Sequence, residues 1–388
     1  MFSSRTNWDF QSSELFALLQ EKCARGEEII DLTEANPTRC GFQYDEHTIL
    51  QALVTQESLR YSPEPKGLLS ARAAVVEFYR RQGITIDPEG VFLTASTSEA
   101  YAFLFRLLCN VGDPVLLPKP SYPLFDYLCE LNDVTPAHYH LMYDGQWRLD
   151  APSLEHALSR HARALVIVHP NNPTGSFLKI PERESVTAFA RRYGLALIVD
   201  EVFHTYAFDD DVRRAASFAG NEQVLTFTLN GLSKLLGLPQ MKLAWLVVSG
   251  PVAERDEAIK RLEIIADTFL SVGTPVQHAL PSLMSDASAI TVQIRTRVHN
   301  NYLLVAEAVT GSSLSTFRCE GGWNALLRLP GTMRDEEWAL TLLRDQNVLV
   351  HPGHLFDMEQ QSCVAISLLP KPEVLRQGLY RMAQVARV

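Results

Sequence analysis

Cysteine is scarce in this sequence. Six cysteines stand far apart in 388 residues, and neither a Cys-x-x-Cys pair nor a Cys/His group with the spacing of a zinc site occurs. This pattern argues against a metal centre, so we expect none. A reduced, cytoplasmic compartment is the simplest expectation for a chain with so few cysteines.

Long apolar runs are missing as well. The longest purely apolar stretches have five or six residues, as at 243–248, whereas a membrane-spanning helix needs about 20. The N-terminal segment MFSSRTNWDFQSSE lacks the apolar centre of a signal peptide. We therefore expect neither a membrane span nor a secretory signal.

An excess of positive charge is also absent. Lys and Arg number 35 against 45 Asp and Glu, which gives a formal net charge of −10. A dedicated nucleic-acid-binding protein normally carries a basic face, so we expect no nucleic-acid partner. Gly and Pro, with 20 and 21 residues, are too few for a fibrous or low-complexity chain. The composition is that of a globular protein with a large core.

Short apolar runs separated by amphipathic stretches fill the middle of the chain. Their Val, Ile and Leu residues are consecutive rather than alternating, which is typical of strands buried on both faces of a parallel sheet. The runs cover 90–95, 114–118, 163–169, 195–200, 224–229 and 243–248. Helical stripes at 99–110 and 182–193 lie between them. The sequence thus predicts an α/β fold with a mainly parallel sheet between helices.

The last hundred residues follow another pattern. Helical periodicity at 284–309 and 334–345 flanks short predicted strands near 324–329 and 363–368. This arrangement is typical of an α+β unit and indicates a separate, smaller domain. Near the N-terminus, one helix is predicted at 12–25.

Polar residues gather where the predicted strands end. In open α/β sheets, ligands bind outside the carboxyl ends of the strands. Five separate segments place polar groups there, namely Ser96 to Ser98, Tyr122, Asn171 and Asn172, Asp200, and Lys234. Their convergence predicts one ligand-binding crevice.

Each of these segments also has an ordinary structural explanation. The S-x-x-E sequence at 96–99 is a capping box, although its hydroxyl and N–H groups also suit a phosphate. The P-N-N-P-T-G sequence at 170–175 is compatible with a plain turn. Asp200, at the end of an apolar strand, is either a cap or ion-pair partner or a carboxylate that faces a cationic ligand atom. Lys234 is either a solvated surface amine or a desolvated nucleophile.

Taken in order, these motifs resemble those of a known enzyme family. P-N-N-P-T-G, D-E-V-F at 200–203 and G-L-S-K at 231–234, with Lys242 eight residues further on, resemble the fold-type I pyridoxal-phosphate enzymes. Within that group the chain is most similar to the class I/II aminotransferases. Asn36-Pro37, the segment 61–67, P-S-Y-P at 120–123 and H-P-G at 351–353 agree with this resemblance, which extends over almost the whole chain.

The resemblance implies a role for each residue. Lys234 would form a Schiff base with pyridoxal 5′-phosphate and carry the proton, while Asp200 would pair with the pyridinium nitrogen so that the ring acts as an electron sink. Asn172 would donate to the ring oxygen O3′, and Tyr122 would stack on the ring. The phosphate would be held by Ser96, Thr97, Ser98, Ser233 and Lys242, together with Tyr61 from the neighbouring subunit of a homodimer with shared active sites.

Three positions near the implied cofactor depart from the family pattern. Lys242 stands where the family has an Arg, which keeps the charge but loses the bidentate fork, and Gly231 stands where it usually has Ser. Phe203 replaces the Tyr that donates to O3′, so we expect a higher pKa for the Schiff base. His204 and Tyr206 are candidates to compensate.

A fourth departure concerns the substrate. Ala365 occupies the position of the Arg that clamps the substrate α-carboxylate, and no Arg occurs between positions 344 and 376. Losing such a charge-assisted pair costs on the order of a few kcal/mol. Either the substrate has no free α-carboxylate, or another cation takes over, the candidates being Arg5, Arg39 and Lys66.

The expected protein is therefore a fold-type I enzyme with a sheet of the seven-stranded type. Its large domain would span 41–277, and its small domain would combine 1–40 with 278–388. The expected reaction moves an amino group from an amino acid or related amine to a 2-oxo acid. Two alternatives stay open: β-elimination at a C–S bond or decarboxylation on the same cofactor, and a non-catalytic regulator that binds the cofactor or an amine.

Overall fold

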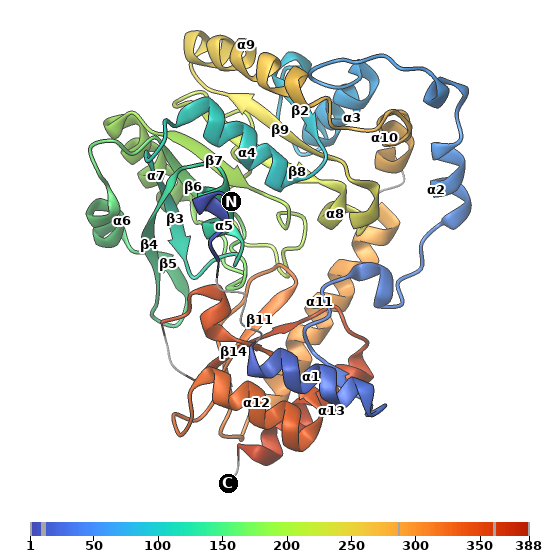
Figure 1. Ribbon diagram of the computed structural model, residues 1–388, viewed down its shortest axis with the longest axis vertical. Helices are drawn as coiled ribbons and strands as arrows, with labels where there is room; N and C mark the ends of the chain where they lie inside the picture. The colour runs from blue at the N-terminus through green and yellow to red at the C-terminus, as the bar shows by residue number, and fades with distance from the viewer. Residues whose placement is uncertain (1, 9–12, 286–287, 360–361, 387–388) are drawn as a thin grey trace.

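Two sheets in different parts of the molecule organise the fold (Figure 1). The structure, a computed structural model, describes residues 2–8, 13–285, 288–359 and 362–386. One sheet takes eight strands from the segment 91–249, and the other takes four strands from 315–367. A short parallel pair, β1 (Ile30–Asp31) with β12 (Val348–Leu349), ties the N-terminal segment to the second part.

The large sheet confirms the predicted mainly parallel arrangement. Its order is β2 (Val91–Thr94), β9 (Ala244–Ser249), β8 (Thr226–Gly231), β7 (Ala196–Asp200), β6 (Ala164–Val168), β3 (Pro114–Lys119), β4 (Thr135–Tyr143) and β5 (Trp147–Leu149). All six strands expected from the apolar runs are present. β9 runs antiparallel to both neighbours, and β5 is a short antiparallel strand added at the edge beside β4.

Both faces of this sheet are buried, which is why its strands read as continuous apolar runs. Within β6, Val166 packs on the side of α4 (Thr97–Leu108) and α9 (Val252–Phe269). The neighbouring Leu165 and Ile167 pack on the other side, against α6 (Ala151–Ala157) and α7 (Ile180–Tyr193). Alternate side chains of one strand therefore serve two separate cores.

The second sheet is antiparallel and has the order β10 (Ser315–Thr316), β11 (Asn324–Arg328), β14 (Cys363–Ser367) and β13 (His351–Pro352). Its apolar residues share one core with α1 (Glu14–Ala24), α11 (Ser288–Val309), α12 (Asp335–Gln346) and α13 (Pro372–Val385). In Figure 1 these helices gather around the sheet in the lower part of the molecule. The predicted α+β unit is present.

Several helices differ from the expectations. The helical pattern at 284–309 belongs to two helices, because α10 (Thr274–Ser285) ends shortly before α11 begins. α2 (Glu46–Leu53) and α3 (Leu69–Arg80) pack against α10, and α5 (Phe125–Leu131) follows β3; neither these nor α9 and α13 were predicted from the sequence. In the described part of the chain, no helix has the length and apolarity needed to cross a membrane.

Candidate active site

The predicted site residues lie along one edge of the large sheet. β2, β3, β6, β7 and β8 run in the same direction, so their carboxyl ends share that edge. Asp200 is the last residue of β7, and Asn172 lies in the loop after β6. Lys234 lies on the short helix α8 (Leu232–Leu235), directly after β8. The structure therefore brings the five polar segments to one place.

The half-buried Lys234 places its amine beside two aromatic rings. Its Nζ lies 5.1 Å from the centre of the Trp323 ring and 5.8 Å from that of Phe203. Burial lowers the pKa of this amine, while the nearby charge of Asp200 opposes the shift. The hydroxyl of Tyr206 holds the helix in place by donating to the carbonyls of Lys234 at 2.7 Å and Leu235 at 3.1 Å. Lys234 is thus not a solvated surface lysine.

The carboxylate of Asp200 is buried and fixed at both oxygens. Oδ1 accepts from the Val202 N–H at 3.1 Å, and Oδ2 accepts from the hydroxyl of Tyr101 on α4 at 3.3 Å. Burial raises the pKa of Asp200 to about 6, and the Lys234 amine is the cation that opposes this rise. A buried carboxylate of this kind is suited to a cationic atom of a ligand.

The helix α4 begins with the predicted capping box. Ser96 Oγ accepts from the Glu99 N–H at 3.1 Å, and Glu99 Oε2 accepts from the Ala95 N–H at 2.7 Å. Thr97 and Ser98 form the half-buried first turn. The N-terminal end of a helix of 12 residues, with hydroxyl groups around it, is suited to an anion.

Two further predicted phosphate ligands, Ser233 and Lys242, lie in the segment between β8 and β9 and differ in exposure. Ser233 is half-buried on α8, one residue before Lys234. Lys242 is exposed, and its backbone has a left-handed conformation with φ of 50°. It directly precedes the stretch that enters β9. Tyr61 is 77% exposed, in a segment between α2 and α3.

The two asparagines of the P-N-N-P-T-G motif have different surroundings. Asn171 is buried and holds the loop itself: its Nδ2 donates to the Pro120 carbonyl at 3.2 Å, and its Oδ1 accepts from Thr174 Oγ1 at 2.9 Å. Asn172 is half-buried, and its Oδ1 accepts from Asn324 Nδ2 at 2.7 Å. Among the described residues, no hydrogen-bond partner takes up the NH₂ group of Asn172.

Tyr122 lies at the same edge as Asp200. Burial, and secondly the charge of Asp200, raise the pKa of the Tyr122 hydroxyl. The ring is 38% exposed and meets Phe125 edge-on, with 5.9 Å between the ring centres. One face of the ring is thus free for a planar ligand.

Neither residue expected to compensate for Phe203 is directed to the site. The Tyr206 hydroxyl is already bonded to the backbone of α8. The His204 ring packs against that of His169, with 5.1 Å between the centres. The glycine at position 231, where the family usually has serine, has a steric explanation. A Cβ there would lie only 2.7 Å from Ala244 Cβ.

Ala365 does not leave a hollow. It is 1% exposed on β14 and packs in an apolar cluster with Trp147, Phe317, Leu326, Phe356, Met358 and Cys363. The position of the expected arginine therefore lies in an apolar cluster and offers no cation to a substrate.

The three candidate cations differ in how closely a carboxylate pairs with each of them. Arg5 is paired with Asp133 at 2.5 Å, and Lys66 is paired with Glu89 at 2.8 Å. Arg39 lies in a 3-10 turn (Pro37–Arg39); its guanidinium is 75% exposed, and the carboxylate paired with it, on Glu34, is 4.0 Å away. Arg39 is therefore the least engaged of the three.

The sequence pattern did not reveal the roles of four residues of this site. Tyr101 lies next to the apolar stripe of its helix and has no distinguishing neighbour. Tyr206 and Asn324 act through contacts between segments far apart in the chain. Trp323 looks like a packing residue, and it does pack against Phe203 and Tyr206, but it also faces the Lys234 amine.

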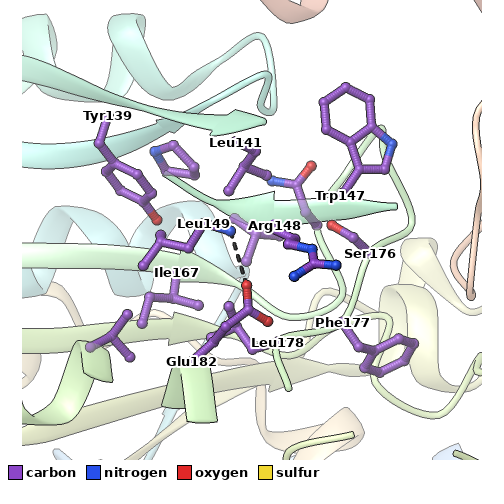
Figure 2. A pocket seen from close by; sticks show the side chains of 14 residues that line it. Tyr139, Leu141, Trp147, Arg148, Leu149, Ile167, Ser176, Phe177, Leu178 and Glu182 are labelled. Atoms are coloured by element: carbon purple, nitrogen blue, oxygen red, sulfur yellow. Dashed lines mark hydrogen bonds between the residues drawn. The ribbon is translucent and has the colours of Figure 1, made fainter. Parts of the chain in front are cut away.

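Two cavities lie near this edge without containing Lys234 or Asp200. Figure 2 shows a cavity of about 20 Å³ between Tyr139, Trp147 and Ile167, beside the Glu182 carboxylate, which accepts from the Leu149 N–H at 2.9 Å. It has room for about one water molecule and not for a substrate. A second cavity, of about 650 Å³, lies between α3, α10 and α11 and is bounded at its inner end by residues 204, 205 and 235.

Comparisons with known proteins agree on the kind of protein that this site belongs to. A family profile described as "Aminotransferase class I and II" matches residues 27–381. The glutamate-pyruvate aminotransferase AlaA of Haemophilus influenzae is 26% identical over 92% of this chain and 91% of its own length. The alanine aminotransferase of Mycobacterium bovis is 29% identical over 92% of this chain and 86% of its own.

Solved structures show the same fold. An alanine aminotransferase from Pyrococcus furiosus superposes with a TM-score of 0.91 over the full length of both chains at 22% identity. A Thermus thermophilus aspartate aminotransferase mutant gives 0.86 over 99% of both chains, also at 22% identity.

Proposed function

Because the chain belongs to the class I and II aminotransferases, which use pyridoxal 5′-phosphate, we propose that Lys234, Asp200 and Asn172 hold and operate this cofactor. The protein is a fold-type I, pyridoxal-phosphate-dependent transaminase that moves an amino group from an amino acid to a 2-oxo acid. Elimination, decarboxylation and a regulator without catalysis are not favoured by these relatives. The observation that carries the residue assignment is the desolvated Lys234 amine beside the buried Asp200 carboxylate.

The residues at the sheet edge fit this cofactor. When bound, the cofactor supplies a cationic ring that withdraws electrons from the bond that breaks at the substrate Cα. The Asp200 carboxylate, whose pKa burial raises despite the nearby Lys234 amine, would gain a second cation in the protonated ring nitrogen. The Lys234 amine, with its lowered pKa, would attach the cofactor covalently and would then hold the proton that leaves the substrate Cα.

The anionic end of the cofactor is proposed to lie at the start of α4. The helix N-terminus and the hydroxyls of Ser96, Thr97 and Ser98 favour negative charge there. Ser233 and the cation Lys242 would complete this site. Tyr122 would cover the ring.

We propose a homodimer with shared sites, in which the partner subunit's Tyr61 reaches the phosphate. The 77% exposure of the Tyr61 side chain supports this proposal, since the ring has little packing within its own subunit. The division into a large domain at 41–277 and a small domain at 1–40 and 278–388, and the cytoplasmic location, also remain proposals. The separate positions of the two sheets favour that division.

Arg39 is proposed as the residue that binds the substrate carboxylate. Its segment packs against the end of α8, because Tyr44 Oη donates to the Gly237 carbonyl at 2.7 Å and Pro37 Cβ lies 3.4 Å from the place of a Cβ at Gly237. The exposed guanidinium can swing without breaking a close ion pair. The names of the relatives favour alanine, or glutamate with pyruvate, as substrates.

Replacing Lys234 tests the assignment most simply. Lys234→Ala is expected to abolish transamination and the visible absorption of covalently attached cofactor, whereas Lys260→Ala, an exposed change on α9, keeps both. Retention of both properties by Lys234→Ala would contradict the proposal.

The role of Arg39 needs a comparison between substrates. Arg39→Gln is expected to lower kcat/KM for α-amino acids about 100-fold, the value of one charged hydrogen-bonded pair. Amines without a carboxylate should be unaffected, and Arg5→Gln is the matched control. Equal losses for both kinds of amine would show that Arg39 does not bind the carboxylate.

A further inference from the structure

The amide of Asn172 is held by a residue from the other sheet. Asn324, at the start of β11, donates its Nδ2 to Asn172 Oδ1 at 2.7 Å. We propose that Asn324 is a positioning residue that turns the Asn172 NH₂ group toward the cofactor oxygen O3′. This inference rests on the proposed role of Asn172.

If Asn172 donates to O3′, the chemistry of its amide determines what its Oδ1 must contact. A primary amide has one acceptor oxygen and one donor NH₂ group on the same carbon. If the NH₂ group of Asn172 faces the O3′ oxygen, its Oδ1 must point away and needs a donor. Asn324 supplies that donor, and it does so without adding charge to the site.

Main-chain contacts hold the start of β11 in place. The Gly322 N–H donates to the Tyr206 carbonyl at 3.0 Å, and the Leu368 N–H donates to the Trp323 carbonyl at 2.7 Å. A Cβ at Gly321 would lie 2.5 Å from the Tyr206 carbonyl oxygen, so the backbone approaches closely there. Asn324 is therefore placed by main-chain contacts, as a positioning residue must be.

This contact matters more here than in a site with several donors. Phe203 has no hydroxyl, and the Tyr206 hydroxyl is bonded to the backbone of α8. Ala365 brings no cation toward Asn172, because it is enclosed in the apolar cluster defined above. Among the site residues described here, the donor left for O3′ is the Asn172 amide, and its direction depends on Asn324.

A negative charge at position 324 should reverse the amide. The carboxylate of Asn324→Asp accepts rather than donates, so it would attract the NH₂ group of Asn172 and turn Oδ1 toward O3′. A lost donor leaves more negative charge on O3′, which stabilises the proton on the nitrogen that joins Lys234 to the cofactor. The pKa of that nitrogen should then rise.

The test is a pH titration of the visible absorption of the holoenzyme without substrate. Asn324→Asp is expected to raise the midpoint by about one pH unit, and Asn324→Ala by less. In an Asn172→Ala background, Asn324→Asp should add no further shift, because the amide that it reorients is gone. Asn300→Asp, an exposed change on α11, controls for the added charge.

The possible results separate this inference from the proposed function. A wild-type protein without a visible band of covalently attached cofactor would overturn the proposed function. A normal band with a shift in Asn172→Ala but none in Asn324→Asp would overturn only the role of Asn324. An equal shift by Asn324→Asp with and without Asn172 would show a plain charge effect and would likewise overturn it.

Discussion

The buried carboxylate of Asp200 should destabilise the protein when the cofactor is absent. Its pKa is raised from 3.8 to about 6, mainly by burial. A shift of about 2 pH units corresponds to roughly 3 kcal/mol, at 1.4 kcal/mol per unit. Asp200→Asn removes the charge but keeps the shape, so it should increase the free energy of unfolding of the cofactor-free protein by up to about 3 kcal/mol at neutral pH.

The sign of the effect follows from the two pKa values. Below 3.8 the carboxyl is protonated in both the folded and the unfolded state, and the substitution should change little. Between about pH 4 and 6 the unfolded state loses its proton first, so the penalty on the folded state grows. Above about pH 6 it is complete. The gain from Asp200→Asn should therefore be about 1 kcal/mol at pH 4.5 and about 3 kcal/mol at pH 8.

Denaturant unfolding of the cofactor-free protein at these two pH values measures the gain. Asp210→Asn, at an exposed position, is the matched control and should show no such pH dependence. With cofactor bound, the wild-type protein should be more stable than Asp200→Asn, because Asp200 then faces a cation. A gain that is the same at both pH values, or a loss of stability in the cofactor-free protein, would refute this account of Asp200.

Three further substitutions test neighbouring contacts. Tyr101→Phe removes the hydrogen bond to Asp200 Oδ2 and should weaken cofactor binding several-fold, measured by equilibrium dialysis, with unchanged binding as the contrary result. Gly231→Ser should lower stability by about 1–3 kcal/mol in thermal unfolding because of the contact with Ala244, whereas Gly331→Ser, in open space, should be neutral. Tyr206→Phe leaves two α8 carbonyls without their donor and should reduce kcat at constant KM; an unchanged kcat would show that this bond does not position Lys234.

The parallel sheet and the edge where the site lies could be predicted from the sequence for a physical reason. β6 and β7 are buried on both faces, and burial imposes consecutive apolar residues that are visible without a structure. Strand direction then brings Asp200, Asn172 and Lys234 together. β4 escaped prediction because its residues are mostly half-buried and alternate less clearly.

Contacts between distant segments could not be predicted in this way. The bonds Tyr101–Asp200 and Asn324–Asn172 span 99 and 152 residues, and no local pattern marks Tyr101 or Asn324 as the partner. The same holds for Ala365: its substitution is visible in the sequence, but the apolar cluster around it comes from five separate places in the chain. The hydroxyl of Tyr206, a candidate to replace that lost at Phe203, turns out to hold α8.

The most direct test of the account is the visible absorption of the purified holoenzyme during titration with a panel of amines. The panel should contain common α-amino acids, alanine and glutamate among them, and amines without an α-carboxylate. We predict that an α-amino acid removes the band of the lysine-linked cofactor and that a 2-oxo acid restores it. A response to amines without the carboxylate alone, or release of ammonia without a 2-oxo acid acceptor, would contradict it.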